Sequence, residues 1–312
     1  MNPVDRNRLI VLLGPTASGK TEVSLHLAGL LPIEIISADS RQVYEYLDIG
    51  TAKPNKKYLD SVPHHFISII KPDNYYSAGI FAGQAENVID EIIRRNRIPI
   101  VVGGSGLYIK ALCEGLFEES SLIDHGKLSI RSKIEHQLKN EGIESLYKDL
   151  LYYDPISAAK YSDMNPRRIV RALEYYYSSG IQISVAQLKS ECYSSRKIIY
   201  FGIRTERNEL YERINLRTEF MWSEGLVEET KSILSKGYSP QLNSLNTVGY
   251  KEALAFLSGK LSEDEAIDKM KQSTRNYAKR QVTWFKKVPG VIWMSGDPDV
   301  IAKKILSHLN NM

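Results

Sequence analysis

The sequence of 312 residues has few cysteines, no long apolar run and no strong excess of charge of either sign. Its two cysteines, Cys113 and Cys192, are too few for a disulfide framework or a zinc site built mainly from thiolates, and we expect both to be ordinary buried thiols. No apolar run reaches the about 18 residues that a transmembrane helix needs, so no membrane span is expected. Lys and Arg exceed Asp and Glu by only 41 to 37, so the net charge of +4 does not by itself indicate a nucleic-acid partner.

The overall composition is that of a soluble globular protein. With 43% hydrophobic and 25% charged residues, neither a disordered chain nor a fibrous repeat is expected. An apolar run at 9–13 leads directly into Gly14. Because a secretory signal has a longer apolar region and a small-residue cleavage site, we predict that this run is a buried strand instead.

Short apolar runs alternate with helical patterns along the first third of the chain and again after residue 196. The predicted strands cover 9–13, 33–37, 98–102, 197–203 and 291–294. Strands separated by helices predict a parallel sheet with helices on both faces. Residues from about 118 to 195 instead have a helical pattern without a convincing strand, and a second helical region runs from 208 to about 287.

Residues 14–21 have the sequence GPTASGKT, which matches the phosphate-binding pattern G-x-x-x-x-G-K-[ST] and lies between a predicted strand and a helix. By average composition the bare pattern would occur in roughly one chain in a hundred of this length. Glycines let backbone amides turn around phosphate oxygens, Lys20 adds a positive charge, and the Thr21 hydroxyl can hold magnesium. We therefore expect a diphosphate or triphosphate group to bind here. The predicted binding residues are Gly14, Pro15, Thr16, Ala17, Ser18, Gly19, Lys20 and Thr21.

These features predict an α/β fold in which a P-loop parallel-sheet core carries a helical insertion domain. We place the core at 1–117 and 196–312 and the insertion domain at 118–195, with a long helical segment before the last strand. The chain shows no internal repeat and no low-complexity segment.

Asp39 comes just after the second predicted strand, at the edge where open parallel sheets bind their ligands. An Asp at such a position is often an N-cap or a turn residue, and it can equally be a magnesium ligand or a general base. The third strand ends in a glycine cluster at 103–106, which suits either close approach of a ligand or tight packing of strand and helix. A glycine there, instead of an acid, argues against a motor ATPase.

Two basic clusters lie outside the phosphate-binding region. Arg167 and Arg171 are four residues apart and share a helix face, with Arg168 adjacent. The segment 274–287 contains five basic residues, three aromatic residues and no acid. A charge run is often only a solvated face, but two such clusters favour a surface for a nucleic-acid backbone. The histidines at 64–65 are expected to be structural, because no third metal ligand lies at suitable spacing.

Nine sequence blocks follow one another at natural spacing from about residue 8 to residue 294: GPTASGKT, ISADSRQVY, DIGTAKP, PHH, YSAG, VVGGSGLYIKAL, NPRRIVRALE, TVGYKE and RNYAKRQVTWFKK. Each block is weakly specific, but the set closely resembles the tRNA dimethylallyltransferase family. The resemblance implies transfer of a dimethylallyl group from dimethylallyl diphosphate to the exocyclic amine of the adenosine at tRNA position 37, next to the anticodon, with release of diphosphate.

The same resemblance implies roles for individual residues. The phosphate-binding loop would hold the diphosphate leaving group, and Lys20 with a magnesium ion bound by Thr21 would stabilise the charge that develops on it. Arg217, in ERINLRTEFM, matches a family arginine that helps to bind the diphosphate. Asp39 would accept a proton from the adenine amine. The target base would have to leave the anticodon stack to reach this site.

The resemblance also implies a tRNA-contacting surface. Ser105 stands where many relatives have threonine, but the hydroxyl is retained. The chain lacks the zinc-finger extension of eukaryotic relatives, and we expect a monomeric bacterial enzyme of the cytoplasm. The implied tRNA-contacting residues are Asp39, Ser40, Arg41, Gln42, Ser105, Arg131, Arg167, Arg168, Ile169, Val170, Arg171, Asn246, Thr247, Val248, Gly249, Tyr250 and Lys251.

Three other functions remain open from the sequence. A small-molecule kinase would use the same loop for ATP but would have no use for the helical basic clusters. An enzyme that prenylates free adenine nucleotides would share the chemistry, although the helical insertion argues against it. A non-catalytic tRNA-binding factor would use a nucleotide only as a switch.

Overall fold

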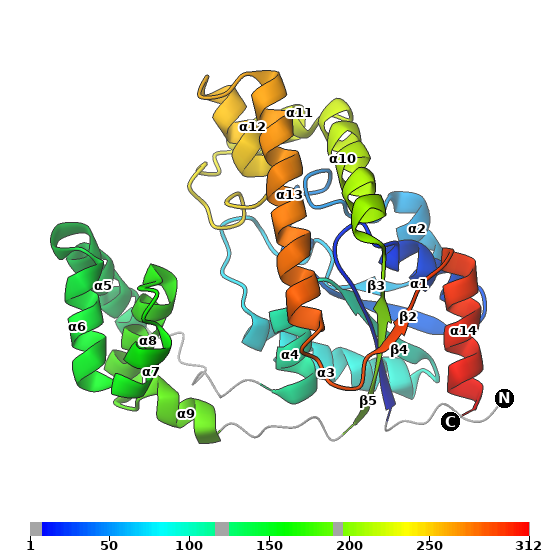
Figure 1. The fold of residues 1–312 in the computed structure, drawn as a ribbon, viewed down its shortest axis with the longest axis horizontal. Helices are drawn as coiled ribbons and strands as arrows, with labels where there is room; N and C mark the ends of the chain where they lie inside the picture. The colour runs from blue at the N-terminus through cyan, green and yellow to red at the C-terminus, as the bar shows by residue number, and fades with distance from the viewer. Residues whose placement is uncertain (1–7, 116–124, 190–195, 312) are drawn as a thin grey trace. The chain divides into compact units, whose positions relative to one another are not determined.

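The computed structural model describes residues 8–115, 125–189 and 196–311 (Figure 1). The chain divides into two compact units, a core unit formed by Met1–Cys113 with Ser195–Met312 and an insertion unit formed by Glu114–Ser194. The domain boundaries predicted at 117/118 and 195/196 fall on or beside residues outside the described part of the chain. Each unit is therefore considered by itself below.

The core unit is built on a six-stranded parallel sheet with the strand order β3-β2-β4-β1-β5-β6. The strands are β1 (Arg8–Leu13), β2 (Ile33–Ala38), β3 (His64–His65), β4 (Ile98–Gly103), β5 (Lys197–Ile203) and β6 (Ile292–Met294). β1 lies between β4 and β5, and the register places Leu13 beside Gly103 and Gly202. The predicted α/β class is confirmed, as are the five predicted strands, whose ends shift by at most one residue.

The edge strand β3 was not predicted. His64 and His65 pair with Ile35 and Ile36 of β2. His65 Nε2 also lies 2.8 Å from a carboxylate oxygen of the buried Glu34, which gives this histidine a structural role, as expected. A strand of two residues is too short to produce the alternation from which strands are predicted.

Helices cover both faces of the sheet (Figure 1). On one face, α1 (Lys20–Ala28) and α14 (Pro298–Asn310) share an apolar cluster with Ile10 and Leu12 of β1 and with Phe201 of β5. α3 (Ala78–Arg94) and α4 (Gly106–Glu114) lie on the other face, and the short α2 (Lys56–Ser61) precedes β3. Because β1 is buried on both faces, its sequence is continuously apolar. Cys113, in α4, is buried as expected, whereas Cys192 lies outside the described residues.

The long helical segment predicted before the last strand is present in the core unit. It contains α10 (Arg207–Ser223), α11 (Leu226–Ser235), α12 (Tyr250–Leu257) and α13 (Glu263–Phe285). α13 begins with a capping box in which Ser262 and Glu265 each bond the other's backbone amide. Farther along, Ala278 of α13 packs against Ile214 of α10 and Ala17 of the phosphate-binding loop. This packing brings α13 to the edge of the sheet where the loop lies.

The insertion unit is helical throughout its described residues. Its helices are α5 (His125–Glu141), α6 (Ile143–Tyr153), α7 (Pro155–Lys160), α8 (Pro166–Ser179) and α9 (Ile183–Lys189). They enclose an apolar core of their own that includes Ile134 and Leu173. The buried Asp154 accepts hydrogen bonds from the amides and hydroxyls of Ser157 and Ser184, which ties α7 to α9.

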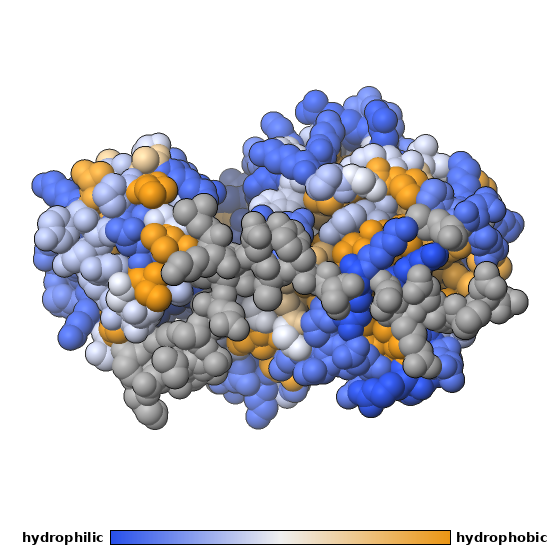
Figure 2. Space-filling view, turned by 90° about the horizontal axis from the view of Figure 1, so that it is seen from below, coloured by the Kyte–Doolittle hydropathy of each residue, from blue (hydrophilic) through white to orange (hydrophobic). Residues whose placement is uncertain are grey.

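The described helices include none that is both long and apolar enough to cross a membrane. On the face drawn in Figure 2, hydrophobic residues reach the surface in separate patches among hydrophilic ones. Strongly exposed apolar side chains, such as Tyr152 of α6 and Leu216 of α10, come from different elements.

Candidate active site

The phosphate-binding loop connects β1 to α1 at the carboxyl edge of the sheet. Ala17 (φ 63°) and Gly19 (φ 87°) both have left-handed backbone conformations, which are uncommon for alanine. A Cβ atom at Gly14 would lie 2.8 Å from Ser18 Oγ and 3.4 Å from the backbone oxygen of Ile203, so a larger residue would crowd this turn. The buried Ser18 hydroxyl has no hydrogen-bond partner among the described residues. The loop thus has the tight curvature of a site that surrounds an anion.

Two cationic side chains from different helices reach this loop. Lys20, the first residue of α1, donates a hydrogen bond from Nζ to Pro15 O at 2.7 Å. Arg217 of α10 donates from Nη2 to the hydroxyl of Thr16, which is 201 positions away in the sequence. The structure therefore brings together the phosphate-binding loop, Lys20 and Arg217, which the sequence assigned to one site.

Both cations are half-buried at the pocket. Burial, together with the positive charge of Arg217, lowers the pKa of Lys20 to about 8, and the carboxylates of Asp39 and Glu22 only partly offset this shift. Burial also lowers the pKa of Arg217. Within the described residues, neither cation forms an ion pair with an acidic side chain. Because two neighbouring cations that are partly removed from water are costly without an anionic partner, the site suits a ligand with several negative charges.

Asp39 follows β2 and forms a turn at the edge of the same site. Its Oδ1 accepts hydrogen bonds from the backbone amides of Arg41 (2.8 Å) and Gln42 (3.3 Å). Its Oδ2 accepts no hydrogen bond from the described residues. The turn interpretation is thus correct for one carboxylate oxygen, and the other oxygen is available to a ligand.

The glycine cluster after β4 packs tightly against its neighbours. A Cβ atom at Gly103 would lie 2.2 Å from the backbone oxygen at the end of β2. One at Gly104 would lie 2.3 Å from Gln281 Nε2, and one at Gly106 would lie 2.4 Å from the Trp284 ring. Close packing between strand and helix, one of the two alternatives for this cluster, therefore accounts for these three glycines.

Two side chains of α13 reach the site that were not predicted to be there. Gln281 accepts a hydrogen bond from Thr16 N and donates one to Gly104 O, both at 2.8 Å. Burial, with the negative charge of Asp39, raises the pKa of Tyr277 to about 12, so its hydroxyl stays protonated. From the sequence this segment was expected only to form a basic surface. Tyr277 and Gln281 are four residues apart and so share one helix face, which is the pattern that could have indicated their shared position.

Two pockets meet at these residues. The phosphate pocket, of about 600 Å³, is lined by Thr16 to Thr21, Asp39 and Arg217 among others. The aromatic pocket, of about 480 Å³, is lined by Tyr76, Tyr108 and Trp284, with Arg41 and Arg280. Gly104, Tyr277 and Gln281 line both pockets. One site therefore offers a cationic compartment, which includes Asp39, and an adjoining aromatic compartment.

Other residues assigned to tRNA contact surround the aromatic pocket or lie nearby. Ser40 N donates to Ser105 Oγ at 3.1 Å, and Arg41 donates to a backbone oxygen of the loop before α12. The segment 246–251 leads into α12, where the side chain of Tyr250 is buried. Any RNA contact made by Tyr250 would therefore use its backbone.

The remaining predicted tRNA-contacting residues belong to the insertion unit. Arg131 forms an ion pair with Glu174 at 3.4 Å. Arg167 and Arg168 are exposed on α8, whereas residues 169–170 are buried in the core of this unit. Contact between these arginines and RNA stays a prediction.

A parallel sheet with a phosphate-binding loop at its carboxyl edge defines the class of P-loop α/β proteins. Within that class the chain belongs to the IPP transferase family, whose model matches residues 42–288. It is 42% identical to "tRNA dimethylallyltransferase 1" of Syntrophotalea carbinolica over 93% of this chain and 91% of that protein. Identity is also 42% to the tRNA dimethylallyltransferase of Geobacter sulfurreducens, over 93% and 92% of the two chains. The family resemblance seen in the motifs is confirmed.

Solved structures agree with this assignment. The full-length tRNA isopentenylpyrophosphate transferase of Bacillus halodurans has a TM-score of 0.71 at 36% identity, covering 98% of this chain and 96% of that one. A eukaryotic dimethylallyltransferase described as acting on tRNA has a TM-score of 0.83 at 28% identity, covering 98% of this chain and 79% of that one.

Proposed function

We propose that this chain is a tRNA dimethylallyltransferase, which moves a dimethylallyl group from dimethylallyl diphosphate to the exocyclic amine of the adenosine at tRNA position 37. The observation that carries the proposal is the pair of half-buried cations, Lys20 and Arg217, which share with Asp39 a pocket that meets an aromatic pocket. A kinase also needs the cations, but the aromatic pocket suits a planar base. Family membership and the names of the relatives support the same conclusion.

The cationic compartment would stabilise the leaving group. As the bond between the allylic carbon and the diphosphate oxygen breaks, its electron pair stays on the diphosphate. Lys20, Arg217 and the curled loop would stabilise that charge better than they stabilise the intact substrate.

The residues also fit a magnesium ion held jointly with the diphosphate. The Thr21 hydroxyl lines the phosphate pocket and makes no hydrogen bond within the described residues. Those residues contain no group of three or more acidic, histidine or cysteine side chains that would hold a metal unaided. Thr21 would therefore share the ion with the diphosphate oxygens, and the ion would supply further positive charge to the leaving group.

The aromatic compartment would receive the target base. Tyr76, Tyr108 and Trp284 provide the flat apolar surfaces on which an extruded base can stack. The amine nitrogen would then attack the allylic carbon, and Asp39 Oδ2 would accept the proton that the nitrogen loses. Asp39 to Gln42, Ser105, Asn246 to Lys251, Arg131 and Arg167 to Arg171 would hold the RNA, and the enzyme would work as a monomer in the cytoplasm.

One experiment separates this proposal from its rivals. The purified chain is incubated with magnesium, labelled dimethylallyl diphosphate and unmodified tRNA, with AMP and labelled ATP in parallel reactions. We expect label in tRNA, mapped to the adenosine next to the anticodon, and stoichiometric release of diphosphate. Label in AMP instead, phosphate transfer from ATP, or tRNA binding without any product would overturn the proposal in favour of the corresponding rival.

A further inference from the structure

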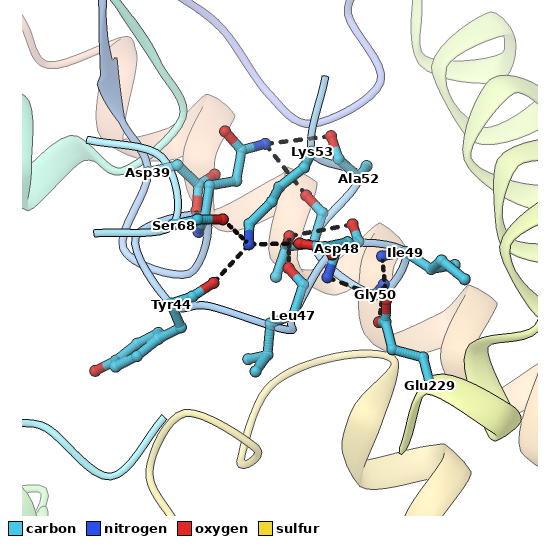
Figure 3. A network of polar contacts seen from close by, with 12 residues as sticks. Asp39, Tyr44, Leu47, Asp48, Ile49, Gly50, Ala52, Lys53, Ser68 and Glu229 are labelled. Carbon is cyan, nitrogen blue, oxygen red and sulfur yellow. Dashed lines mark hydrogen bonds and ion pairs between the residues drawn. The ribbon is translucent and has the colours of Figure 1, made fainter. Parts of the chain in front are cut away.

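Glu229, on α11, binds a loop that is remote from it in the sequence. Its Oε2 accepts hydrogen bonds from the backbone amides of Asp48 (3.2 Å) and Ile49 (2.9 Å), and its Oε1 accepts one from Gly50 (3.2 Å) (Figure 3). The same Oε1 accepts a hydrogen bond from the Tyr250 hydroxyl. One carboxylate thus holds three consecutive amides of the loop 48–52 and the first residue of α12.

Tyr250 packs closely against the loop 48–52, and its hydroxyl stays a hydrogen-bond donor. Its ring is buried against the loop, and a Cβ atom at Gly50 would lie 2.3 Å from it. Burial raises the pKa of Tyr250 far above its ordinary value, so its hydroxyl remains a donor to Glu229 at all physiological pH values. The segment 246–251, proposed to contact RNA, is therefore bonded directly to the loop 48–52.

The other side of the loop is fixed by Lys53, whose side chain is only 5% exposed. Lys53 Nζ donates to Asp48 Oδ1 and Ser68 Oγ, both at 2.7 Å, and to Tyr44 O at 2.5 Å (Figure 3). The loop is thus held in one conformation from both sides.

Gln42 connects this loop to the reacting centre. Its Nε2 donates to Thr51 O at 3.3 Å and to Ala52 O at 3.2 Å. Its Oε1 accepts a hydrogen bond from Ser37 Oγ at 3.1 Å, and its backbone amide is one of the two that bind Asp39 Oδ1. An unbroken series of hydrogen bonds and peptide bonds therefore runs from Glu229 through the loop and Gln42 to Asp39.

We propose that Glu229 is a positioning residue for the transfer reaction, which holds the loop 48–52 so that Gln42 keeps Asp39 aimed at the target amine. The inference rests on the proposed function and adds a residue that does not line either pocket. Through Tyr250 the same contacts tie the placement of Asp39 to the segment 246–251. A purely structural role is the alternative, and it predicts loss of stability without a specific loss of rate.

The test compares Glu229→Gln with Glu228→Gln, its neighbour on the same helix. Glu228 is a matched control because its side chain is 71% exposed and its partner is a lysine at 3.8 Å. Glutamine at position 229 has nearly the same shape as glutamate. Its NH₂ group is a donor and cannot accept a hydrogen bond from the backbone amides of the loop. Each variant is assayed for its melting temperature, for affinity for a non-reactive analogue of the donor, and for its single-turnover rate with donor and tRNA prebound.

We expect Glu229→Gln to lower the single-turnover rate about tenfold or more, while donor affinity stays within about twofold of the unmodified chain. Glu228→Gln should match the unmodified chain in all three measurements. Hydrogen exchange should become faster in 39–42 as well as in 48–52. A rate within about twofold of the unmodified chain would overturn the proposal.

A double-mutant cycle separates positioning from general destabilisation. If Glu229 acts through Gln42, the pair Glu229→Gln with Gln42→Ala should lose no more rate than Gln42→Ala alone. Independent, multiplicative losses would contradict the proposal. Should Glu229→Gln fail to fold, Tyr250→Phe removes one bond to the same carboxylate, and it must then show the same selective loss of rate and the same coupling to Gln42. The unmodified chain tests the proposed function in the same assay, because its failure to make any product would reject that function before Glu229 is considered.

Discussion

The core unit and the insertion unit differ in how they hold the side chains that we assign to their ligands. In the core unit, the phosphate-binding loop is fixed by Arg217 and Gln281, through contacts that join residues 201 and 265 positions apart. In the insertion unit, Arg131 and Arg168 are more than half exposed. Arg131 pairs with Glu135 and Glu174, and Arg168 pairs with Asp163. Half-buried cations that line a pocket suit chemistry on a bound anion, and more exposed cations suit a surface for an extended partner. We therefore expect core variants to change rate and insertion variants to change affinity.

The variant Lys20→Ala is the strongest test of this difference between the two units. The variant removes a charge that acts on the leaving group in a water-poor site, so turnover should fall about 100- to 1,000-fold. Steady-state kinetics at saturating donor and tRNA measure the loss, and tRNA affinity is the control, which should remain unchanged. Unchanged turnover would place the diphosphate elsewhere and remove the distinction between the units.

Asp39→Asn should have the next largest effect. The amide oxygen can still accept the hydrogen bonds of the turn, so melting temperature and tRNA affinity should change little. Because an amide cannot take up the proton, the single-turnover rate should fall about a hundredfold. If the rate stays within about threefold, Asp39 is only a turn or metal-positioning residue.

The pH dependence of donor binding sharpens the assignment of Lys20. With a pKa of about 8 in the free site, Lys20 is charged at pH 7 and loses its charge as the pH rises towards 9. If only charged Lys20 supports binding, affinity for a non-reactive donor analogue should therefore fall about fivefold between pH 8 and pH 9. Calorimetry over this range, with Lys20→Arg as a control that stays charged, measures the effect, and identical profiles for the two proteins would exclude Lys20 as its cause.

The smallest expected effect is in the insertion unit. Replacing Arg167, Arg168 and Arg171 together by glutamine should weaken tRNA binding and reduce the slope of log affinity against log salt by roughly one unit for each lost phosphate contact. Donor binding and the rate at saturating tRNA should not change. An unaltered salt slope would show that this cluster is only a solvated face.

The parts of the fold that could be predicted are those in which neighbouring residues carry the information. Residues 9–13 of β1 are all buried and are apolar without interruption, and the phosphate-binding loop has a fixed local spacing. Glu229 and Gln281 could not be assigned, because their roles depend on packing with residues far away in the sequence. The two-residue strand β3 was missed since it contains too few positions to show a pattern.

The attachment of Thr16 has a consequence for synthesis of the protein. Its hydroxyl accepts a hydrogen bond from Arg217 of α10 and its amide donates one to Gln281 of α13, so the loop leaves the ribosome long before both of its partners. Until residue 281 has emerged, the nascent chain carries the complete phosphate-binding sequence but lacks at least one of the two side chains, Arg217 and Gln281, that form hydrogen bonds with it. The donor site is therefore completed only after residue 281 has been made, and a fragment released before that point would hold the loop without Arg217 and Gln281 in place.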